Sequence, residues 1–290
     1  MSQNPTHEQI MVAIRESGYL MEQDVATKLE ALEFHIKTNA AFEDPEEHKS
    51  REIDVLAIKR VAVNESAKIM AFVELILECK NSTNPLVFIT RPKNEADLHA
   101  TPKQFLYPNR YEMRKDLGGG RALSREIDPF FHLGFDQLHY CHRQRTKAVQ
   151  FCRIDRKGGD WHANHGGLYD ALFYPMAKAV TARRAKVPRG RARDDWKYIW
   201  LLFPIVVISG DLFVLDSAKN HPMPEPQDWI SFSRELESGK LSGIYTLDFV
   251  RQGQLEKFVH ECIEPISGLA KELVETRAEF LLQVQLPWQD

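Results

Sequence analysis

The sequence predicts a single α/β domain in which helices flank a central mixed β-sheet. Residues 19–34 carry apolar side chains at successive spacings of four, four and three, which is the pattern of one buried helix face. Two apolar segments of strand length, 51–63 and 68–80, follow with a turn signal between them. A later helical pattern at 165–184 leads into a strongly apolar strand at 198–209. Helices and strands that alternate in this way are typical of a layered α/β architecture.

The remaining elements are assigned from the same signals. Further helices are expected at 8–17 and 254–280, and further strands at 35–42, 86–90, 148–154, 212–215, 229–233 and 244–250. The last helix is expected to break near Pro265. Gly210-Asp211 separates two apolar runs and predicts a β-hairpin.

The stretch between the fourth and fifth predicted strands has a different composition. It contains several prolines and the run Gly118-Gly119-Gly120, so we expect an irregular insertion with short helices and a flexible glycine loop. The predicted domain spans 1–290, with a core at about 18–90 and 148–216, an insertion at about 91–147 and a C-terminal extension at about 217–290.

Composition and charge narrow the class of protein. The 290 residues are 43% hydrophobic and 27% charged, with a net charge of −3, which is ordinary for a globular protein and gives no overall basic character. The four cysteines are scattered, which favours free thiols in a reducing compartment. No apolar run approaches the roughly 20 residues of a membrane span. We therefore expect a cytoplasmic protein without a membrane partner.

The hairpin formed by 51–63 and 68–80 brings acidic and basic side chains together. Asp54 and Glu78 lie about 12 residues on either side of the turn, so they should be near-opposite in an antiparallel pair. Glu78 and Lys80 share a strand face because side chains alternate along a strand. Glu74 is on that face too, and we expect it to be structural or solvent-facing.

Two neighbouring carboxylates at the end of an apolar hairpin repel each other, and a hard cation would relieve this. Mg²⁺ prefers carboxylate oxygens and retains water, which suits phosphate chemistry. On the helical wheel of the preceding helix, both Glu22 and Glu33 fall at the edge of the apolar stripe. Helix geometry alone leaves open which of them joins the centre.

Three stretches carry a family resemblance: Gly18-Tyr19-Leu20-Met21-Glu22-Gln23-Asp24-Val25, Arg51-Glu52-Ile53-Asp54-Val55-Leu56-Ala57 and Glu78-Cys79-Lys80-Asn81-Ser82. Together they resemble the PD-(D/E)XK nucleases of the restriction-endonuclease-like fold, although Ile53 replaces the proline of the family name. The resemblance implies an α-β-β-β-α-β core with 165–184 as its second helix.

The resemblance also implies an active site and an activity. Glu22, Asp54, Glu78 and Lys80 would be catalytic. Asp54, Glu78 and the backbone carbonyl of Cys79 would bind Mg²⁺ or Mn²⁺. The implied activity is hydrolysis of phosphodiester bonds, with DNA as the expected substrate, in restriction, repair or antiphage defence. Many relatives act as homodimers, so a homodimer is also expected.

Nucleic-acid contacts and rival functions complete the sequence-based expectations. The sequence contains a run of basic residues, Arg183, Arg184, Lys186, Arg189, Arg191 and Arg193. We expect this run either to bind the phosphates of a nucleic acid or to be a solvated loop. One rival function is a catalytically inactive nuclease fold that binds nucleic acid or nucleotides. A second is a regulatory protein in which the hairpin carries only an ion pair at its edge.

Overall fold

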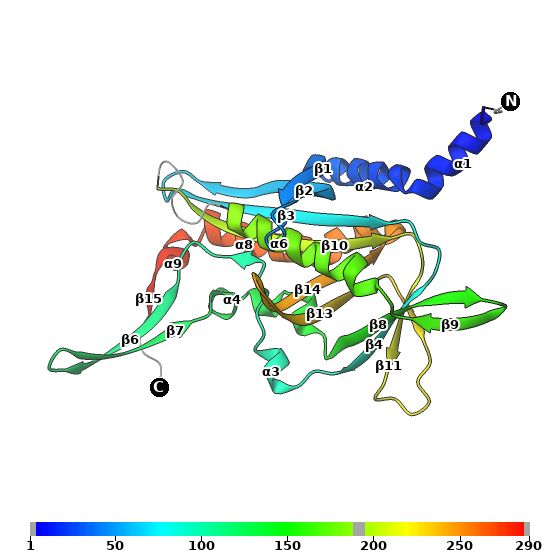
Figure 1. Ribbon diagram of the computed structural model, residues 1–290. Helices are drawn as coiled ribbons and strands as arrows, with labels where there is room; N and C mark the ends of the chain where they lie inside the picture. The colour runs from blue at the N-terminus through cyan, green and yellow to red at the C-terminus, as the bar shows by residue number, and fades with distance from the viewer. Residues whose placement is uncertain (1–3, 188–194, 287–290) are drawn as a thin grey trace.

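The computed structural model describes residues 4–187 and 195–286 (Figure 1). Within these residues the helices are α1 His7–Ser17, α2 Tyr19–Ala31, α3 Glu95–Leu98, α4 Pro129–His132, α5 Tyr140–Arg143, α6 Tyr174–Lys186, α7 Leu255–Phe258, α8 Glu264–Glu275 and α9 Ala278–Leu282. The strands are β1 His35–Glu43, β2 Ser50–Asn64, β3 Ile69–Lys80, β4 Leu86–Pro92, β5 Phe105–Leu106, β6 Tyr111–Gly118, β7 Arg121–Ile127, β8 Thr146–Lys157, β9 Asp160–Asn164, β10 Lys197–Ile208, β11 Leu212–Asp216, β12 Glu225–Gln227, β13 Trp229–Ser238, β14 Leu241–Arg251 and β15 Gln285–Leu286.

A large mixed sheet organises the fold, as the sequence predicts. Its strand order is β1-β2-β3-β10-β14-β13-β8-β4-β11-β12. β1, β2 and β3 form an antiparallel meander, whereas β10 runs parallel to β3 over its whole length, from Lys197 opposite Ile69 to Ile208 opposite Lys80. Along the chain, α2, β1, β2 and β3 are followed by α6 and β10 only after β4 to β9 and α3 to α5.

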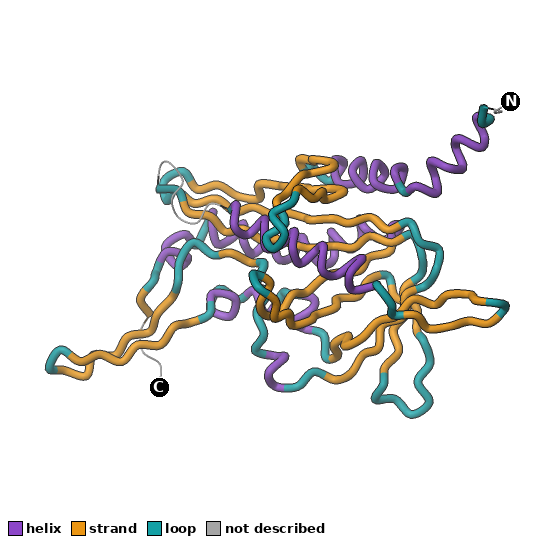
Figure 2. Tube along the Cα trace, in the orientation of Figure 1, coloured by secondary structure: helices purple, strands orange, loops and turns teal. Residues whose placement is uncertain are grey.

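Helices cover both faces of this sheet, as Figure 2 shows in purple. On β3, Val73, Leu75 and Leu77 enter a hydrophobic cluster shared with α2 and α8, while Ile76 enters a second cluster shared with α6. This alternation follows from the two-residue period of a strand. Burial on both faces explains why β3 and β10 read as nearly continuous apolar runs.

The predicted hairpin around Gly210 is wrong. β10 has β3 on one side and β14 on the other, so neither edge is open to β11, which pairs with β4 instead. Gly210 makes the tight exit from β10, where an added Cβ would lie 2.5 Å from the Ser82 carbonyl oxygen. The turn signal was correct, but the strand after the turn pairs with a more distant segment.

The insertion contains a β-ribbon that the sequence did not predict. β6 and β7 pair antiparallel, and β15 joins β6 in a separate three-stranded sheet. Gly118, Gly119 and Gly120 all have positive φ and form the turn of this ribbon. Glycine adopts such angles readily, so the predicted flexible loop is a hairpin turn.

The C-terminal segment is helical, with interruptions. A π-helical turn at 259–263 precedes α8, whose first turn contains Pro265. The break predicted near Pro265 is therefore the start of α8, a position at which proline is compatible with a helix. None of the described helices combines the length and apolar character needed to cross a membrane.

Candidate active site

The site lies where β2 and β3 part. Their register runs to Val55 opposite Leu77, which places Asp54 and Glu78 at the next position. This agrees with the prediction made by counting residues from the turn. Between the site and the turn, a bulge near residue 61 shifts the strand register by one position. The Asp54 carboxylate accepts a hydrogen bond at Oδ2 from the Cys79 backbone N–H, at 2.7 Å. The side chain of Asp54 on β2 thus accepts a hydrogen bond from the main chain of β3, at the point where the pairing of the two strands ends.

Glu78 and Lys80 form an ion pair on the exposed side of the same strand end. The Lys80 Nζ lies 2.6 Å from the Glu78 Oε1. The Glu78 side chain is 16% exposed and that of Lys80 is 35% exposed, so solvent reaches both groups. The strand therefore presents a carboxylate and an ammonium group at an accessible position.

The tertiary structure selects Glu22, and not Glu33, as the helix carboxylate of this centre. Glu22 is near enough to Asp54 and Glu78 for their charges to raise its pKa, beyond the larger effect of burial. Glu33 follows the end of α2 with a φ of 65° and an 84% exposed side chain that pairs with Lys59. Of these two glutamates, Glu22 is therefore the one that lies near the end of the β2–β3 hairpin.

Asn81 holds α1 and α2 against the strand end. Its Nδ2 donates to the carbonyl of Arg15 at 2.7 Å, and its Oδ1 accepts from the Ser209 hydroxyl at 3.1 Å. Gly18, with a φ of 86°, joins α1 to α2 and lies 3.5 Å, measured from an ideal Cβ, from the Asn81 Cβ. These contacts fix the start of the helix that carries Glu22 beside the residue that follows Lys80.

The three carboxylates oppose one another electrostatically. Burial raises the pKa of Glu78, and the charge of Asp54 raises it further, while Lys80 acts in the opposite direction. Burial likewise raises the pKa of Asp54, against the hydrogen bond from Cys79 and the charge of Lys80. With Glu22, three acids therefore face one ammonium group, and a bound cation would stabilise their charged forms.

The donor set suits a hard divalent cation. Among the described residues, no group of three or more His, Cys, Asp or Glu side chains is arranged to hold a metal ion. A cation here would therefore depend on the carboxylates of Asp54 and Glu78, a main-chain oxygen such as that of Cys79, and water. Mg²⁺ characteristically binds with one or two carboxylates and several waters, so the residues fit this ion.

Glu74, on the same face of β3, is in a different environment. It is fully buried, and both its oxygens accept hydrogen bonds from the Arg183 guanidinium, one of them also from the Trp200 indole at 2.9 Å. Glu74 is therefore structural. Arg183, predicted to bind nucleic acid, is engaged in this internal ion pair instead.

Two further residues of the basic run, Arg184 and Lys186, are at the end of α6. Arg184 is half-buried and Lys186 is exposed at the end of α6, whereas Arg189, Arg191 and Arg193 lie outside the described residues. The chain after α6 leads to Lys197, which is opposite Ile69, the first residue of β3. Lys80 is the last residue of β3, at the other end of the strand. Eleven strand residues correspond to about 35 Å, so the start of β10 is far from the centre.

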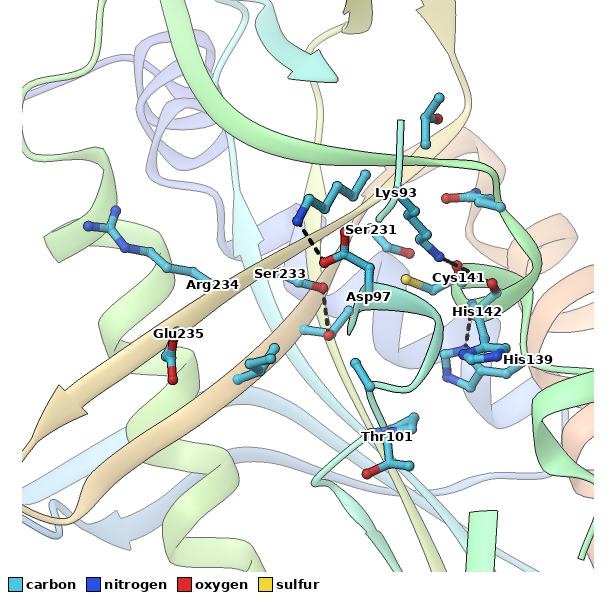
Figure 3. Close-up of a pocket in the computed structure, with 17 residues that line it drawn as sticks. Lys93, Asp97, Thr101, His139, Cys141, His142, Ser231, Ser233, Arg234 and Glu235 are labelled. Carbon is cyan, nitrogen blue, oxygen red and sulfur yellow. Dashed lines mark hydrogen bonds and ion pairs between the residues drawn. The ribbon is translucent and has the colours of Figure 1, made fainter. Parts of the chain in front are cut away.

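A separate cavity of about 280 Å³ lies between the insertion and the surface of β13 and β14 (Figure 3). Its polar side chains are largely paired, with Lys147 2.6 Å from Asp97 and Ser233 2.7 Å from Thr246. Lys93 donates to the carbonyls of two residues of α5. The cavity contains none of the four predicted catalytic residues.

Beneath this cavity, buried Asp248 accepts hydrogen bonds from Ser231 and Tyr140, and burial raises its pKa to about 6. Tyr140 belongs to the insertion and Asp248 to β14, 108 residues later. Asn81 and this network were both missed at the sequence level, since no local signal links residues so far apart. No protein-family model, curated protein or solved structure matches the chain.

Proposed function

We propose that this protein is a metal-dependent nuclease of the PD-(D/E)XK type that hydrolyses phosphodiester bonds, with DNA as its substrate. The observation that carries the proposal is the convergence of Glu22, Asp54, Glu78 and Lys80 at the open end of the β2–β3 hairpin. The order α2-β1-β2-β3-α6-β10, with β10 parallel to β3, supports it.

Each residue has a role that follows from its position. Asp54 and Glu78 would hold a Mg²⁺ or Mn²⁺ ion, whose charge activates water and stabilises negative charge on a phosphate. Lys80, partly exposed and adjacent to Glu78, can orient the attacking water or donate to a phosphate oxygen as charge develops. Glu22 faces the same space from α2 and can accept a hydrogen bond from that water.

The ground-state pairing of Lys80 with Glu78 is compatible with this role. Without a cation, Lys80 is the nearest positive charge for Glu78. A divalent ion would compete for that carboxylate and free the ammonium group to contact substrate. Lys80 thus stabilises the centre in one state and assists the reaction in the other.

The test is cleavage of plasmid DNA with Mg²⁺ or Mn²⁺ by wild-type protein, Lys80→Ala and Lys59→Ala. Lys59 is a matched control because it is partly exposed on β2 and pairs with Glu33 away from the centre. We expect Lys80→Ala to lose about 10²–10³-fold in rate, the size of a lost charge-stabilising group, and Lys59→Ala to cleave like wild type. Equal cleavage by wild type and Lys80→Ala, or none by any variant with either metal, would refute the proposal.

A further inference from the structure

The β6–β7 ribbon projects from the body as a two-stranded arm, at the left of Figure 1. All 13 residues from Arg114 to Glu126 are exposed. A two-stranded hairpin alone has marginal stability in water, so an arm of this kind needs support at its base or from a bound partner.

The base of the arm is firmly attached. Tyr111, fully buried, donates a hydrogen bond from its hydroxyl to the Leu281 carbonyl at 2.6 Å, and β15 pairs with β6 at Glu112 and Met113. Asn109, just before the arm, accepts a hydrogen bond from Lys197 at 2.9 Å. The arm is thus fixed to α9 and to the start of β10, and the pairing of β15 with β6 is at its base, at Glu112 and Met113.

The charge of the outer part is opposite to that of the whole chain. Residues 114–126 contain four basic residues and two acidic residues, a net charge of +2, whereas the chain carries −3. The side chains of Arg114, Arg121 and Arg125 have no hydrogen-bond or ion-pair partner within the described part of the chain. The arm therefore offers positive charge to an external partner.

The strand register separates two faces of the ribbon. Met113 is opposite Arg125 and Lys115 is opposite Leu123, so these four side chains share one face, and none of the four is acidic. Arg114, opposite Ser124, is on the other face with Asp116. Leu123 is 47% exposed. A face of basic and apolar side chains matches a nucleic-acid groove, which has phosphates along its walls and bases at its floor.

We propose that the β6–β7 arm binds duplex DNA by lying in a groove, at least one helical turn from the phosphate cleaved at the Asp54–Glu78 centre. The major groove, about 12 Å wide, admits a two-stranded β-ribbon. The base of the arm, at Lys197, is about 35 Å along β3 from Lys80. One turn of B-DNA covers about 34–36 Å, and the outer part of the arm lies beyond its base, so a duplex that reaches both the arm and the centre spans more than one turn. This inference rests on the proposed nuclease function and adds that the substrate is duplex DNA held by the arm.

The test uses fluorescence anisotropy with a 30-base-pair duplex, without divalent metal, at several salt concentrations. The triple variant Arg114→Gln/Arg121→Gln/Arg125→Gln is compared with wild type and with Lys37→Gln/Arg60→Gln/Lys271→Gln. The control removes the same charge from three exposed positions elsewhere on the body. We expect the arm variant to bind at least about tenfold more weakly and its slope of log K against log salt to fall by about 2–3, near 0.9 for each lost phosphate contact.

Two controls keep the outcomes separate. Cleavage is measured independently, so DNA binding through the arm without cleavage would overturn the nuclease proposal alone. Cleavage by wild type with equal DNA binding by both triple variants would overturn the arm alone, as would absence of duplex binding by wild type. Light scattering tests whether the partner is a second copy of the chain. If wild type is a dimer, and the arm variant loses the dimer while its DNA affinity is unchanged, the arm proposal is overturned as well.

Discussion

Glu74 and Glu78 lie on one face of one strand, four residues apart, and have opposite electrostatic surroundings. Glu74 is fully buried and accepts hydrogen bonds from Arg183 and Trp200 at both oxygens. Glu78 has Lys80 as a partner, but it also faces Asp54 and Glu22, and its pKa is raised. The first site is complete without any ligand, whereas an added cation would stabilise the charged form of the second.

This difference separates a structural charge from one available for chemistry. A buried carboxylate whose hydrogen bonds are all made holds two elements together, here β3 and α6. A cluster of like charges that remains accessible is destabilising in the free protein and is characteristic of functional sites. In the sequence alone, Glu74 and Glu78 differ in nothing but position, since both are expected on the same face of one strand.

The largest expected effect on stability comes from making the same substitution, Glu to Gln, at each of the two glutamates. Glu74→Gln breaks a buried ion pair and leaves the Arg183 charge without its partner, which should lower the free energy of unfolding by about 3 kcal/mol. Glu78→Gln, in metal-free buffer at neutral pH, should leave it unchanged or raise it, because one of three repelling charges is removed. Urea denaturation measures both, and equal losses would contradict the distinction.

Divalent metal should produce the next largest effect, through the second site only. Binding to the folded state stabilises by about 2.7 kcal/mol at a metal concentration of 100 times Kd, so Mn²⁺ should raise the melting temperature of the wild-type protein by several degrees. Asp54→Asn should remove this increase, whereas Glu74→Gln should retain it from a lower starting temperature. Differential scanning fluorimetry with an EDTA reference tests this, and an equal Mn²⁺ response from wild type and Asp54→Asn would place the metal elsewhere.

The smallest expected effect concerns the pH dependence of Glu22. Its folded-state pKa is raised, so its charged form destabilises the fold above that pKa, and this penalty fades as pH falls through the raised pKa towards the ordinary value. Glu22→Gln should therefore raise the free energy of unfolding by about 0.5–1 kcal/mol at pH 8, a typical size for one partly exposed charge. The gain should vanish at acidic pH, where the wild-type carboxyl is protonated in the folded state.

Glu33→Gln serves as the comparison for this pH series. Glu33 is 84% exposed and pairs with Lys59, so its substitution should not stabilise the protein at pH 8. A gain from Glu22→Gln that is the same at every pH would show that repulsion within the carboxylate centre is not its cause.

The sequence by itself determined the features that depend on short-range periodicity. The spacing of apolar residues defined α2, and the turn between β2 and β3 placed Asp54 opposite Glu78 to within the one-residue bulge. Strand alternation put Glu78 and Lys80 on one face. These predictions succeeded because a hairpin and a helix are determined by neighbours in the chain.

Tertiary structure alone decided which segments occupy each sheet edge and which charges meet. β14, from the end of the chain, covers the edge of β10 that the predicted hairpin required, and Arg183 reaches Glu74 across 109 residues. The choice of Glu22 over Glu33 depended on how α2 sits against β2 and β3, with Asn81 holding its start. Such contacts join residues far apart in sequence, so they follow from the packing of the whole domain and not from any local pattern.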